Sequence, residues 1–346
     1  MKKKATLNDI AQRLNLTKVS ISKALRDHPD ISEATKKKVK EIAREIGYRP
    51  NLIARSLTSS KTQTIGVVVP KIAHTFSAQV VAGIQRYANS KGFVIVLTVS
   101  DENPELEKKH IESLVSMQVE GLLVSVSMTT KETEIYNWIR EMQIPLVFFD
   151  RYIPDLGFNS VVIDDRKAAK DAVGHLIKSG CRKIAHLAGY NHVSIGRQRR
   201  QGYEEALLEH GIQPDPRMVI EGEVGEDAGY RGFKELLARN IEMDALFSVT
   251  FPVGLGSYVA MREIDPSMID RIEMLAFGDS GIRGIVPYPH YYVEQPGKEI
   301  GRKAAKLLLD EIEGNAKPED RLVYVPTRFL ETDSDLQVTE IELDES

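Results

Sequence analysis

The alternation of apolar and polar residues near the start of the chain predicts a pair of short helices. Between residues 7 and 14, apolar side chains recur at i, i+3, i+4 and i+7, which makes one apolar helix face. Thr6 and Asp9 have the spacing of a helix N-cap and its reciprocal carboxylate. Asn15 ends this helix because Asn enters the left-handed backbone region at low cost, and Thr17 caps the start of a second helix. Two short helices across a tight turn form a helix-turn-helix, whose second helix enters the DNA major groove.

Further along the chain, short apolar runs rich in β-branched residues alternate with helical stretches. The runs lie at 65–69, 93–99, 121–126, 145–149, 183–188, 244–249 and 272–277. Strands that alternate with helices predict parallel, doubly wound sheets. The runs fall into two series, and the chain crosses between them near 161–163 and 290–294. The pattern therefore predicts an α/β body of two lobes around a cleft, preceded by a small all-α helix-turn-helix head that a third helix, capped by Ser32, closes.

Charge divides the chain into the same two parts. Residues 1–61 hold 15 Lys and Arg against 6 Asp and Glu, a net charge of +9, whereas the whole chain holds 46 against 50. Residues 62–346 therefore hold 31 against 44, a net charge of −13. A basic head on an acidic body is typical of a domain that binds DNA phosphates attached to one that does not. Lys-rich N-termini are common in soluble proteins, so charge supports DNA binding only together with the helix pattern.

Five runs of residues form a recognisable pattern: Thr6 through Leu25, Ile31–Thr35, Ile46–Asn51, Ala54–Leu57 and Ile65–Pro70. These runs closely resemble the lactose-repressor/galactose-repressor (LacI/GalR) family of bacterial transcription regulators. The resemblance covers essentially the whole chain and is most specific in its N-terminal fifth. It implies a sequence-specific regulator, most often a repressor, that acts as a homodimer on a near-palindromic double-stranded operator and has a body similar to periplasmic sugar-binding proteins. Asn15 stands where the family usually has Gly, and either residue satisfies the turn.

The resemblance places Lys18, Val19 and Lys23 at the base-reading positions of the second helix. Lys can donate to guanine O6 and N7, and Val can contact a thymine methyl. As alternatives, each Lys could contact phosphate or water, and Val19 could simply be exposed. Short hydroxyl side chains suit phosphate oxygens, which set the register without reading sequence. The expected phosphate-binding residues are Thr6, Thr17, Ser20 and Ser22.

Residues 50–62 are expected to form a hinge helix and a linker. The helical part is too short to be stable alone in water. In the resembling family this hinge folds only on the operator, pairs with the hinge of the dimer mate and inserts a Leu into the minor groove. Leu57 occupies that position, and Asn51, Ala54 and Arg55 belong to the same expected DNA-binding segment. Such a wedge unstacks a base step and kinks the duplex. The alternative is that Leu57 packs on the body.

An effector pocket is expected between the lobes, because ligands of open α/β sheets bind at the carboxyl ends of the strands. The expected effector-binding residues follow strand ends or occupy pocket positions of the resembling family. They are His74, Phe76, Ser77, Asp101, Ser125, Asp150, Arg151, Arg199, Phe251 and Asp279. Arg forks and carboxylates suit a polyhydroxyl or carboxylate ligand. For each polar residue taken alone, a salt bridge or a helix cap explains it equally well.

Two pocket positions depart from the family pattern. Thr250-Phe251 stands where the family commonly has Asn-Asp, and Gly278 stands where it commonly has Asp, with Asp279 directly after it. Phe251 could stack on a sugar face or close the pocket. The expected effector is therefore a small molecule, a sugar or a sugar derivative, but the usual grip on an ordinary hexose is incomplete.

No arrangement of residues points to catalysis, to a metal or to a cofactor. The eight His have no metal-ligand spacing. Gly254-Leu255-Gly256 lacks the third Gly of a dinucleotide site, and Ser280 is not flanked as in a Gly-x-Ser-x-Gly elbow. Cys181 is the only Cys, which fits a reducing compartment. The start of the chain has no apolar signal core, and no run of about 18 apolar residues occurs. We therefore expect a cytoplasmic, nucleoid-associated protein that is not an enzyme.

The expected domains are a helix-turn-helix domain over 1–49, a hinge over 50–62 and an effector-binding and dimerisation domain over 63–346. Lobe 1 is expected at about 63–161 and 292–325, and lobe 2 at about 162–291 and 326–340. The acidic tail has no Leu heptad, so a dimer without a tail-built tetramer is expected. The alternatives are an exported solute-binding protein, a sugar-processing enzyme with an accessory head, and a non-repressing activator with the same body.

Overall fold

The computed structural model describes residues 5–25, 27–48, 62–278, 288, 290–315, 322–333 and 336–343. It contains two compact units, Met1–Thr62 and Gln63–Ser346. The expected hinge residues Asn51, Ala54, Arg55 and Leu57 and the pocket candidate Asp279 lie outside the described residues.

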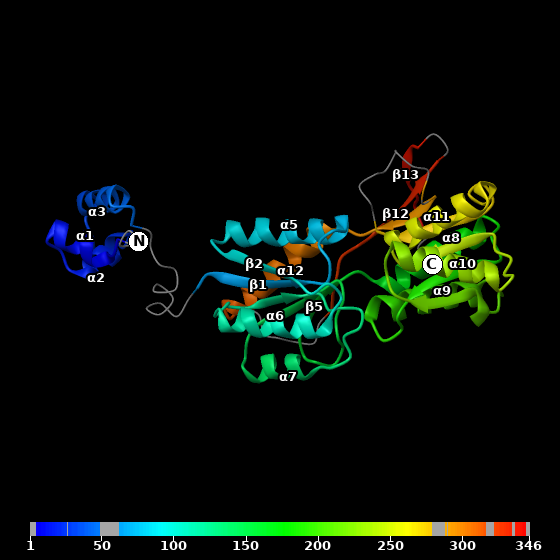
Figure 1. Ribbon diagram of the computed structural model, residues 1–346, viewed down its shortest axis with the longest axis horizontal. Coiled ribbons are helices and arrows are strands. Elements are labelled where there is room, and N and C mark those ends of the chain that lie inside the picture. Colours follow the sequence, from blue (N-terminus) through cyan, green and yellow to red (C-terminus); the bar gives the residue numbers. More distant parts are fainter. Residues whose placement is uncertain are drawn as a thin grey trace. The chain divides into compact units, whose positions relative to one another are not determined.

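Three helices form the described part of the first unit: α1 (Leu7–Leu14), α2 (Lys18–Leu25) and α3 (Glu33–Glu45), coloured blue in Figure 1. The expected capping box opens α1, where the Thr6 amide donates to the Asp9 carboxylate at 2.7 Å. The helix ends at Asn15, whose φ of 50° lies in the left-handed region. A small apolar core that includes Ile10 and Ile21, both fully buried, holds the three helices together. The helix-turn-helix prediction is confirmed.

The body contains two sheets, and the first is parallel. Its strands are β1 (Thr64–Val69), β2 (Val94–Val99), β3 (Leu122–Val124), β4 (Leu146–Phe149), β5 (Asn159–Val162) and β11 (Leu322–Tyr324), in the order β11-β5-β4-β3-β1-β2. Helices α5 (Thr75–Ser90) and α12 (Gly297–Ile312) cover one face, and α6 (Pro104–Ser116) and α7 (Glu134–Glu141) cover the other (Figure 1). Because helices cover both faces, the central strands β1, β3 and β4 read as nearly continuous apolar runs.

The second sheet has the order β13-β12-β10-β9-β8-β6-β7, parallel from β7 to β10 and antiparallel at β12 and β13. Its strands are β6 (Ile184–Gly189), β7 (Val219–Gly222), β8 (Ala245–Ser248), β9 (Glu273–Phe277), β10 (Tyr291–Glu294), β12 (Arg328–Thr332) and β13 (Val338–Glu340). The helices of this lobe are α8 (Asp165–Lys178), α9 (Ser194–Glu209), α10 (Glu226–Ala238) and α11 (Phe251–Ile264), with short 3-10 turns at Pro216–Met218 and Pro266–Met268.

The chain passes between the two sheets three times, after β5, after β10 and after β11. Strand β10 belongs to the second sheet, so the second passage follows Glu294 and comes slightly later than the expected boundary near residue 292. The expectation of a two-lobed, doubly wound α/β body with a small helical head is confirmed. No helix in the described part of the chain is both long and apolar enough to cross a membrane.

Glycines allow the helices of the body to pack in close pairs. A Cβ atom at Gly301 of α12 would overlap the carbonyl oxygen of Val80 on α5, and one at Gly83 of α5 would overlap the carbonyl oxygen of Lys298. The α8–α9 and α10–α11 pairs have glycines at equally close backbone approaches. A side chain at these positions has no space, because the atom that it would meet is rigid backbone.

We predict that Gly301→Ala lowers the free energy of unfolding by about 1–3 kcal/mol, the usual range for overpacking. The matched control is Gly222→Ala in β7, where a Cβ would meet nothing within 4 Å. Urea denaturation followed by far-UV circular dichroism measures both variants. Equal stability of the two variants would contradict the close packing of α5 and α12.

Candidate DNA-reading helix and effector pocket

Helix α2 exposes the residues expected to read DNA bases. Lys18 is exposed, and Val19 keeps 65% of its surface accessible. An apolar side chain so exposed is free to contact an apolar partner group such as a thymine methyl. Lys23 is half-buried, and its ammonium lies 2.8 Å from Asp30. In the free head, therefore, Lys18 and Val19 form the more accessible part of the surface.

The expected phosphate-binding hydroxyls also make contacts within the head. The Thr6 hydroxyl donates to the Asp9 carboxylate at 2.8 Å. The Thr17 hydroxyl accepts from the Ser20 amide at 3.1 Å and so caps α2. Ser22 is half-buried on the same helix. Capping therefore accounts for the contacts of Thr6 and Thr17 in the free head.

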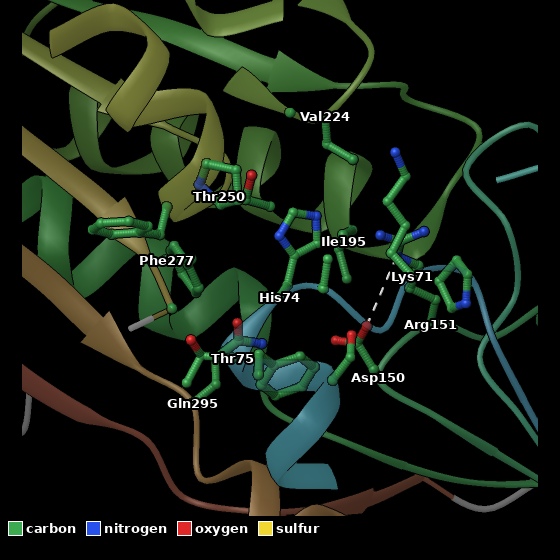
Figure 2. Close-up of a pocket in the computed structure, with 18 of the residues that line it drawn as sticks. Lys71, His74, Thr75, Asp150, Arg151, Ile195, Val224, Thr250, Phe277 and Gln295 are labelled. Carbon is green, nitrogen blue, oxygen red and sulfur yellow. Dashed lines mark ion pairs between the residues drawn. The ribbon is translucent and has the colours of Figure 1, made fainter. Parts of the chain in front are cut away.

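A cavity of about 300 Å³ lies between the two lobes of the body, at the carboxyl ends of their strands (Figure 2). Lobe 1 contributes the segments that follow β1, β2 and β4, and lobe 2 contributes the segments that follow β6, β7, β8 and β9. Figure 2 shows Lys71, Asp150 and Arg151 together on one side and Thr250 and Phe277 on the other. This is the crevice in which open α/β sheets bind their ligands.

Most of the expected pocket residues line this cavity. They are His74, Phe76, Ser77, Asp150, Arg151, Arg199 and Phe251. Asp101 is not part of the lining, because 78% of its side chain is exposed, and its carboxylate lies 3.8 Å from the Lys71 ammonium. Ser125 is buried and does not line the cavity. Burial raises the pKa of Asp150, and the Ser125 hydroxyl is one of the groups that oppose this rise.

Six polar lining residues were not among the expected effector-binding residues: Lys71, Thr75, Glu102, Glu226, Thr250 and Gln295. A signal existed for Glu102, since it follows β2 directly after the expected Asp101. Both residues have left-handed backbone, with φ of 50° and 58°. This turn directs the Glu102 side chain into the cavity, although Asp101 is the residue that follows the strand more closely in sequence. Glu226 and Gln295 had no spacing that set them apart from ordinary residues at the start of a helix.

Arg151 is held by the carboxylate of Glu102. Its Nη1 donates to both Glu102 oxygens, at 2.9 and 3.0 Å, and to the Val126 carbonyl oxygen at 3.3 Å. Its Nε lies 3.8 Å from Asp150 and makes no hydrogen bond within the described part of the chain. The charge of this buried guanidinium is therefore balanced, while one N–H donor is left for a ligand oxygen.

Arg199 is fully buried at the other side of the cavity and pairs with Asp165, the first residue of α8. Its Nε donates to Asp165 at 2.7 Å, and Nη1 donates to the Val249 carbonyl oxygen. The guanidinium carbon also lies 3.9 Å from the centre of the Phe277 ring. Burial raises the pKa of Asp165 to about 6, although the charge of Arg199 opposes the rise.

Two further groups in the cavity, Asp150 and His74, have shifted pKa values. Burial raises the pKa of the Asp150 carboxyl, and the charges of Arg151 and Arg199 oppose that rise. Burial, followed by the charges of Lys71 and Arg151, lowers the pKa of His74, so its imidazole is neutral near pH 7. Within the described residues, no group of three or more His, Cys, Asp or Glu is arranged to hold a metal.

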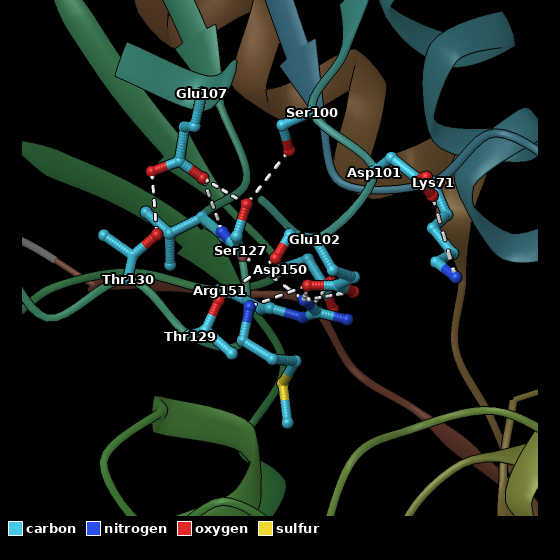
Figure 3. A network of polar contacts seen from close by, with 12 residues as sticks. Lys71, Ser100, Asp101, Glu102, Glu107, Ser127, Thr129, Thr130, Asp150 and Arg151 are labelled. Atoms are coloured by element: carbon cyan, nitrogen blue, oxygen red, sulfur yellow. Dashed lines mark hydrogen bonds and ion pairs between the residues drawn. The ribbon is translucent and has the colours of Figure 1, made fainter. Parts of the chain in front are cut away.

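A second polar network holds the loop after β3 (Figure 3). Glu107 of α6 is 1% exposed and accepts four hydrogen bonds, from the Ser127 amide at 2.6 Å, the Ser127 hydroxyl at 2.7 Å, Thr130 at 3.0 Å and Tyr136 at 2.6 Å. A buried carboxylate with four donors is fully satisfied and keeps its neighbours in one arrangement. The next loop residue, Met128, donates its amide to Glu102 at 2.7 Å.

Met128 also joins the two lobes. Its carbonyl oxygen lies 2.7 Å from Nε2 of His192 in lobe 2. Its side chain is 2% exposed and packs with Val193 and Ile195. Because Ile195 also lines the cavity, the ligand site and the contact between the lobes share a wall.

An exposed basic helix-turn-helix and a two-lobed body with an interlobe pocket define the class of bacterial regulators that couple DNA binding to a small molecule. Residues 6–51 match the model of bacterial regulatory proteins of the lacI family. Residues 62–332 match the model of periplasmic binding proteins and the sugar-binding domain of the LacI family. The chain belongs to the LacI family of transcription regulators.

Individual relatives agree with this assignment. The chain is 28% identical over 310 residues to the HTH-type transcriptional repressor CytR of Escherichia coli, covering 90% of each protein. The lac repressor dimer bound to operator and the anti-inducer ONPF shares the fold, with a TM-score of 0.83 at 22% identity, and the match covers 94% of this chain and 98% of that one. The complex of the transcriptional regulator CelR with cellobiose matches with a TM-score of 0.71 at 27% identity and the same coverage.

We predict that the buried Asp165 makes the protein less stable as the pH rises through about 6. Its folded pKa lies above the unfolded value, so the folded state binds the proton more tightly and loses that advantage when the proton leaves. Relative to Asp165→Asn, which does not titrate, the wild type should lose up to about 3 kcal/mol of unfolding free energy between about pH 4 and about pH 7.

The control for this titration is Glu242→Gln. Lys183 lowers the pKa of Glu242, so the wild type should instead gain stability relative to this variant as the pH rises. Urea denaturation at a series of pH values measures both differences. A pH-independent difference between wild type and Asp165→Asn would contradict the raised pKa of Asp165.

Proposed function

We propose that this protein is a repressor that binds a near-palindromic operator as a homodimer. A small molecule that enters the interlobe pocket would lower or raise the affinity of the protein for this operator. The observation that carries the proposal is the combination of an exposed, basic reading helix and a cavity between lobes on one chain. The lac repressor dimer on its operator and the CelR–cellobiose complex support it by analogy. The domain limits are those expected from the sequence: head 1–49, hinge 50–62 and body 63–346.

On the DNA, Lys18, Val19 and Lys23 would read bases in the major groove. The hydroxyls of Thr6, Thr17, Ser20 and Ser22 would contact phosphates once their caps allow it, together with Asn51 and Arg55. Ala54 and Leu57 of the hinge would enter the minor groove. With a binding rather than a catalytic role, the protein would act in the cytoplasm, on the nucleoid.

In the pocket, a sugar or sugar derivative would contact His74, Ser77, Asp150 and Arg151 from lobe 1, and Arg199 and Phe251 from lobe 2, with Phe76 at the lobe boundary. Asp279 is proposed as a further contact, and Asp101 and Ser125 as supporting groups. Effector binding would alter the lobe angle through the shared wall at Ile195 and Met128. Such coupling requires that the ligand bind one lobe arrangement more tightly than the other.

The deciding experiment is the selection of bound sequences from random duplex DNA by the intact protein at near-physiological salt. A repressor of this kind should recover a near-palindrome with one half-site for each head. A solute-binding protein would recover nothing above salt-sensitive background. Reporter expression from the recovered site then distinguishes a repressor from an activator, and sedimentation distinguishes the expected dimer from a tetramer.

We predict that Lys18→Ala weakens binding to the selected site by about 1–3 kcal/mol and relaxes the preference at one base pair. Lys38→Ala, in the exposed part of α3, is the matched control and should change affinity, if at all, equally for all sequences. Fluorescence anisotropy on the selected site and on single-base variants measures both. A uniform loss in Lys18→Ala would reassign Lys18 to a phosphate contact.

We further predict that Leu57→Ala weakens specific binding while leaving non-specific, salt-sensitive binding nearly unchanged, because the wedge acts only on a kinked site. Anisotropy titrations on the selected duplex and on a scrambled duplex, each at several salt concentrations, give the two affinities. An equal loss on both duplexes would mean that Leu57 supports the body or the dimer rather than entering the minor groove.

A further inference from the structure

The charges that line the cavity balance one another. Three cations, Lys71, Arg151 and Arg199, stand against three carboxylates, Glu102, Asp150 and Glu226, within the described part of the chain. His74 adds no charge near pH 7, because burial and its neighbours lower its pKa. A ligand that brings a negative charge would therefore enter a cavity without an excess of positive charge.

The two guanidiniums are also paired by contact. Arg151 gives Nη1 to both oxygens of Glu102, whose side chain is only 18% exposed. Arg199 gives Nε to Asp165, with side-chain exposures of 1% and 3%. Close ion pairs that are largely buried leave little of the field of each guanidinium for a third partner.

Asp165, buried next to the lining, and Asp101, exposed beside Lys71, add two negative charges. Asp165 pairs with Arg199 at 2.7 Å, and Asp101 lies 3.8 Å from the Lys71 ammonium. With these two included, five carboxylates surround three cations. The field in the cavity opposes an entering anion, because like charges at an interface disfavour binding.

The remaining features of the wall suit an uncharged compound with hydroxyl groups. Arg151 Nε and the Thr250 hydroxyl are buried and make no hydrogen bond to any described residue, so each can bond a neutral ligand oxygen. Phe76 and Phe251 supply aromatic surface from opposite lobes, against which the apolar face of a ring can pack.

We propose that Glu102 and Asp165 determine the charge specificity of the pocket: by neutralising Arg151 and Arg199 they make it accept an uncharged polyhydroxyl ligand and reject the corresponding acids and phosphates. The proposal deepens the proposed function and rests on the cavity being the effector site. It assigns a specificity role to two residues that need not touch the ligand through their own carboxylates.

The test uses inorganic phosphate as the anionic probe and follows the unfolding temperature of the full-length protein near pH 7. Sodium chloride at equal ionic strength serves as the reference, because salt screens exposed charges. The wild type should show no saturable stabilisation by phosphate beyond that reference. Glu102→Gln should bind phosphate saturably, with an affinity at least about tenfold higher than that of the wild type. The double variant Glu102→Gln with Asp150→Asn should bind phosphate more tightly still.

Glu112→Gln, at an exposed position of helix α6, which follows Glu102 in the chain, is the matched control, since it removes one carboxylate that does not line the cavity. It should behave as the wild type does. Phosphate that binds the basic head contributes equally to all five proteins, so differences in phosphate binding between them report on the pocket. Gln at position 102 can still accept from the Met128 amide, which preserves the loop. A cooperative unfolding transition verifies the fold, and Asp165→Asn provides a second, independent removal of charge.

Saturable phosphate binding by the wild type, as tight as in Glu102→Gln, would overturn the proposal, and so would the absence of any gain in both Glu102→Gln and Asp165→Asn. A second arm compares glucose, xylose and cellobiose with their acids and phosphates. An anion that stabilises the wild type more than its neutral parent would also overturn it. If no sugar of this panel binds, the phosphate titrations still decide whether Glu102 and Asp165 set the charge specificity of the pocket. Failure of the operator selection would refute the regulatory function alone, because neither arm contains DNA.

Discussion

The ion pair between Arg151 and Glu102 connects the ligand cavity, the loop after β3 and the contact between the lobes. A guanidinium that is 7% exposed requires a counter-charge, since an unpaired buried charge is strongly destabilising. Glu102 supplies it and at the same time accepts the Met128 amide. Met128 in turn reaches His192 and the small apolar cluster of lobe 2. A ligand that disturbs Arg151 therefore acts on a chain of direct contacts that ends in the other lobe.

The same requirement, that buried charges be paired and hydrogen-bonded, organises the rest of the body. Arg199 with Asp165 fixes the start of α8 against α9, and Glu107 fixes the loop after β3. These pairs do not rank high as sources of net stability, because desolvation offsets much of their attraction. Their effect is to set one arrangement of the cavity wall before any ligand enters, which lowers the cost of ordering the site on binding.

The residues that depart from the expected family pattern, Thr250-Phe251 and Gly278, lie in the lobe 2 wall of the cavity. Phe251 and Gly278 line the lobe 2 wall at positions where the sequence resemblance led us to expect acidic side chains. Phe251 lies against Tyr288 with ring centres 5.6 Å apart, and Gly278, with φ of 96°, ends β9 beside the cavity. Lobe 2 therefore combines apolar surface with the paired Arg199 and the polar groups of Glu226, Thr250 and Gln295, whereas lobe 1 carries the charged residues Lys71, Glu102, Asp150 and Arg151. The two walls differ in character, so a ligand is oriented by which of its faces is polar.

The sequence by itself determined the features that depend on neighbours along the chain. The capping box of Thr6 and Asp9, the left-handed turn at Asn15 and the alternation of strands and helices follow from local backbone preferences and side-chain periodicity. Strand ends also located most of the cavity, including Asp150-Arg151, because parallel strands end at a common edge. Three features were decided only by the tertiary structure. Glu102 rather than Asp101 faces the cavity, and Asp165 forms an ion pair with Arg199. Met128 contacts His192 in the other lobe. Those outcomes depend on burial and on partners 34 to 64 residues away in the chain, for which the linear pattern of residues carries no signal.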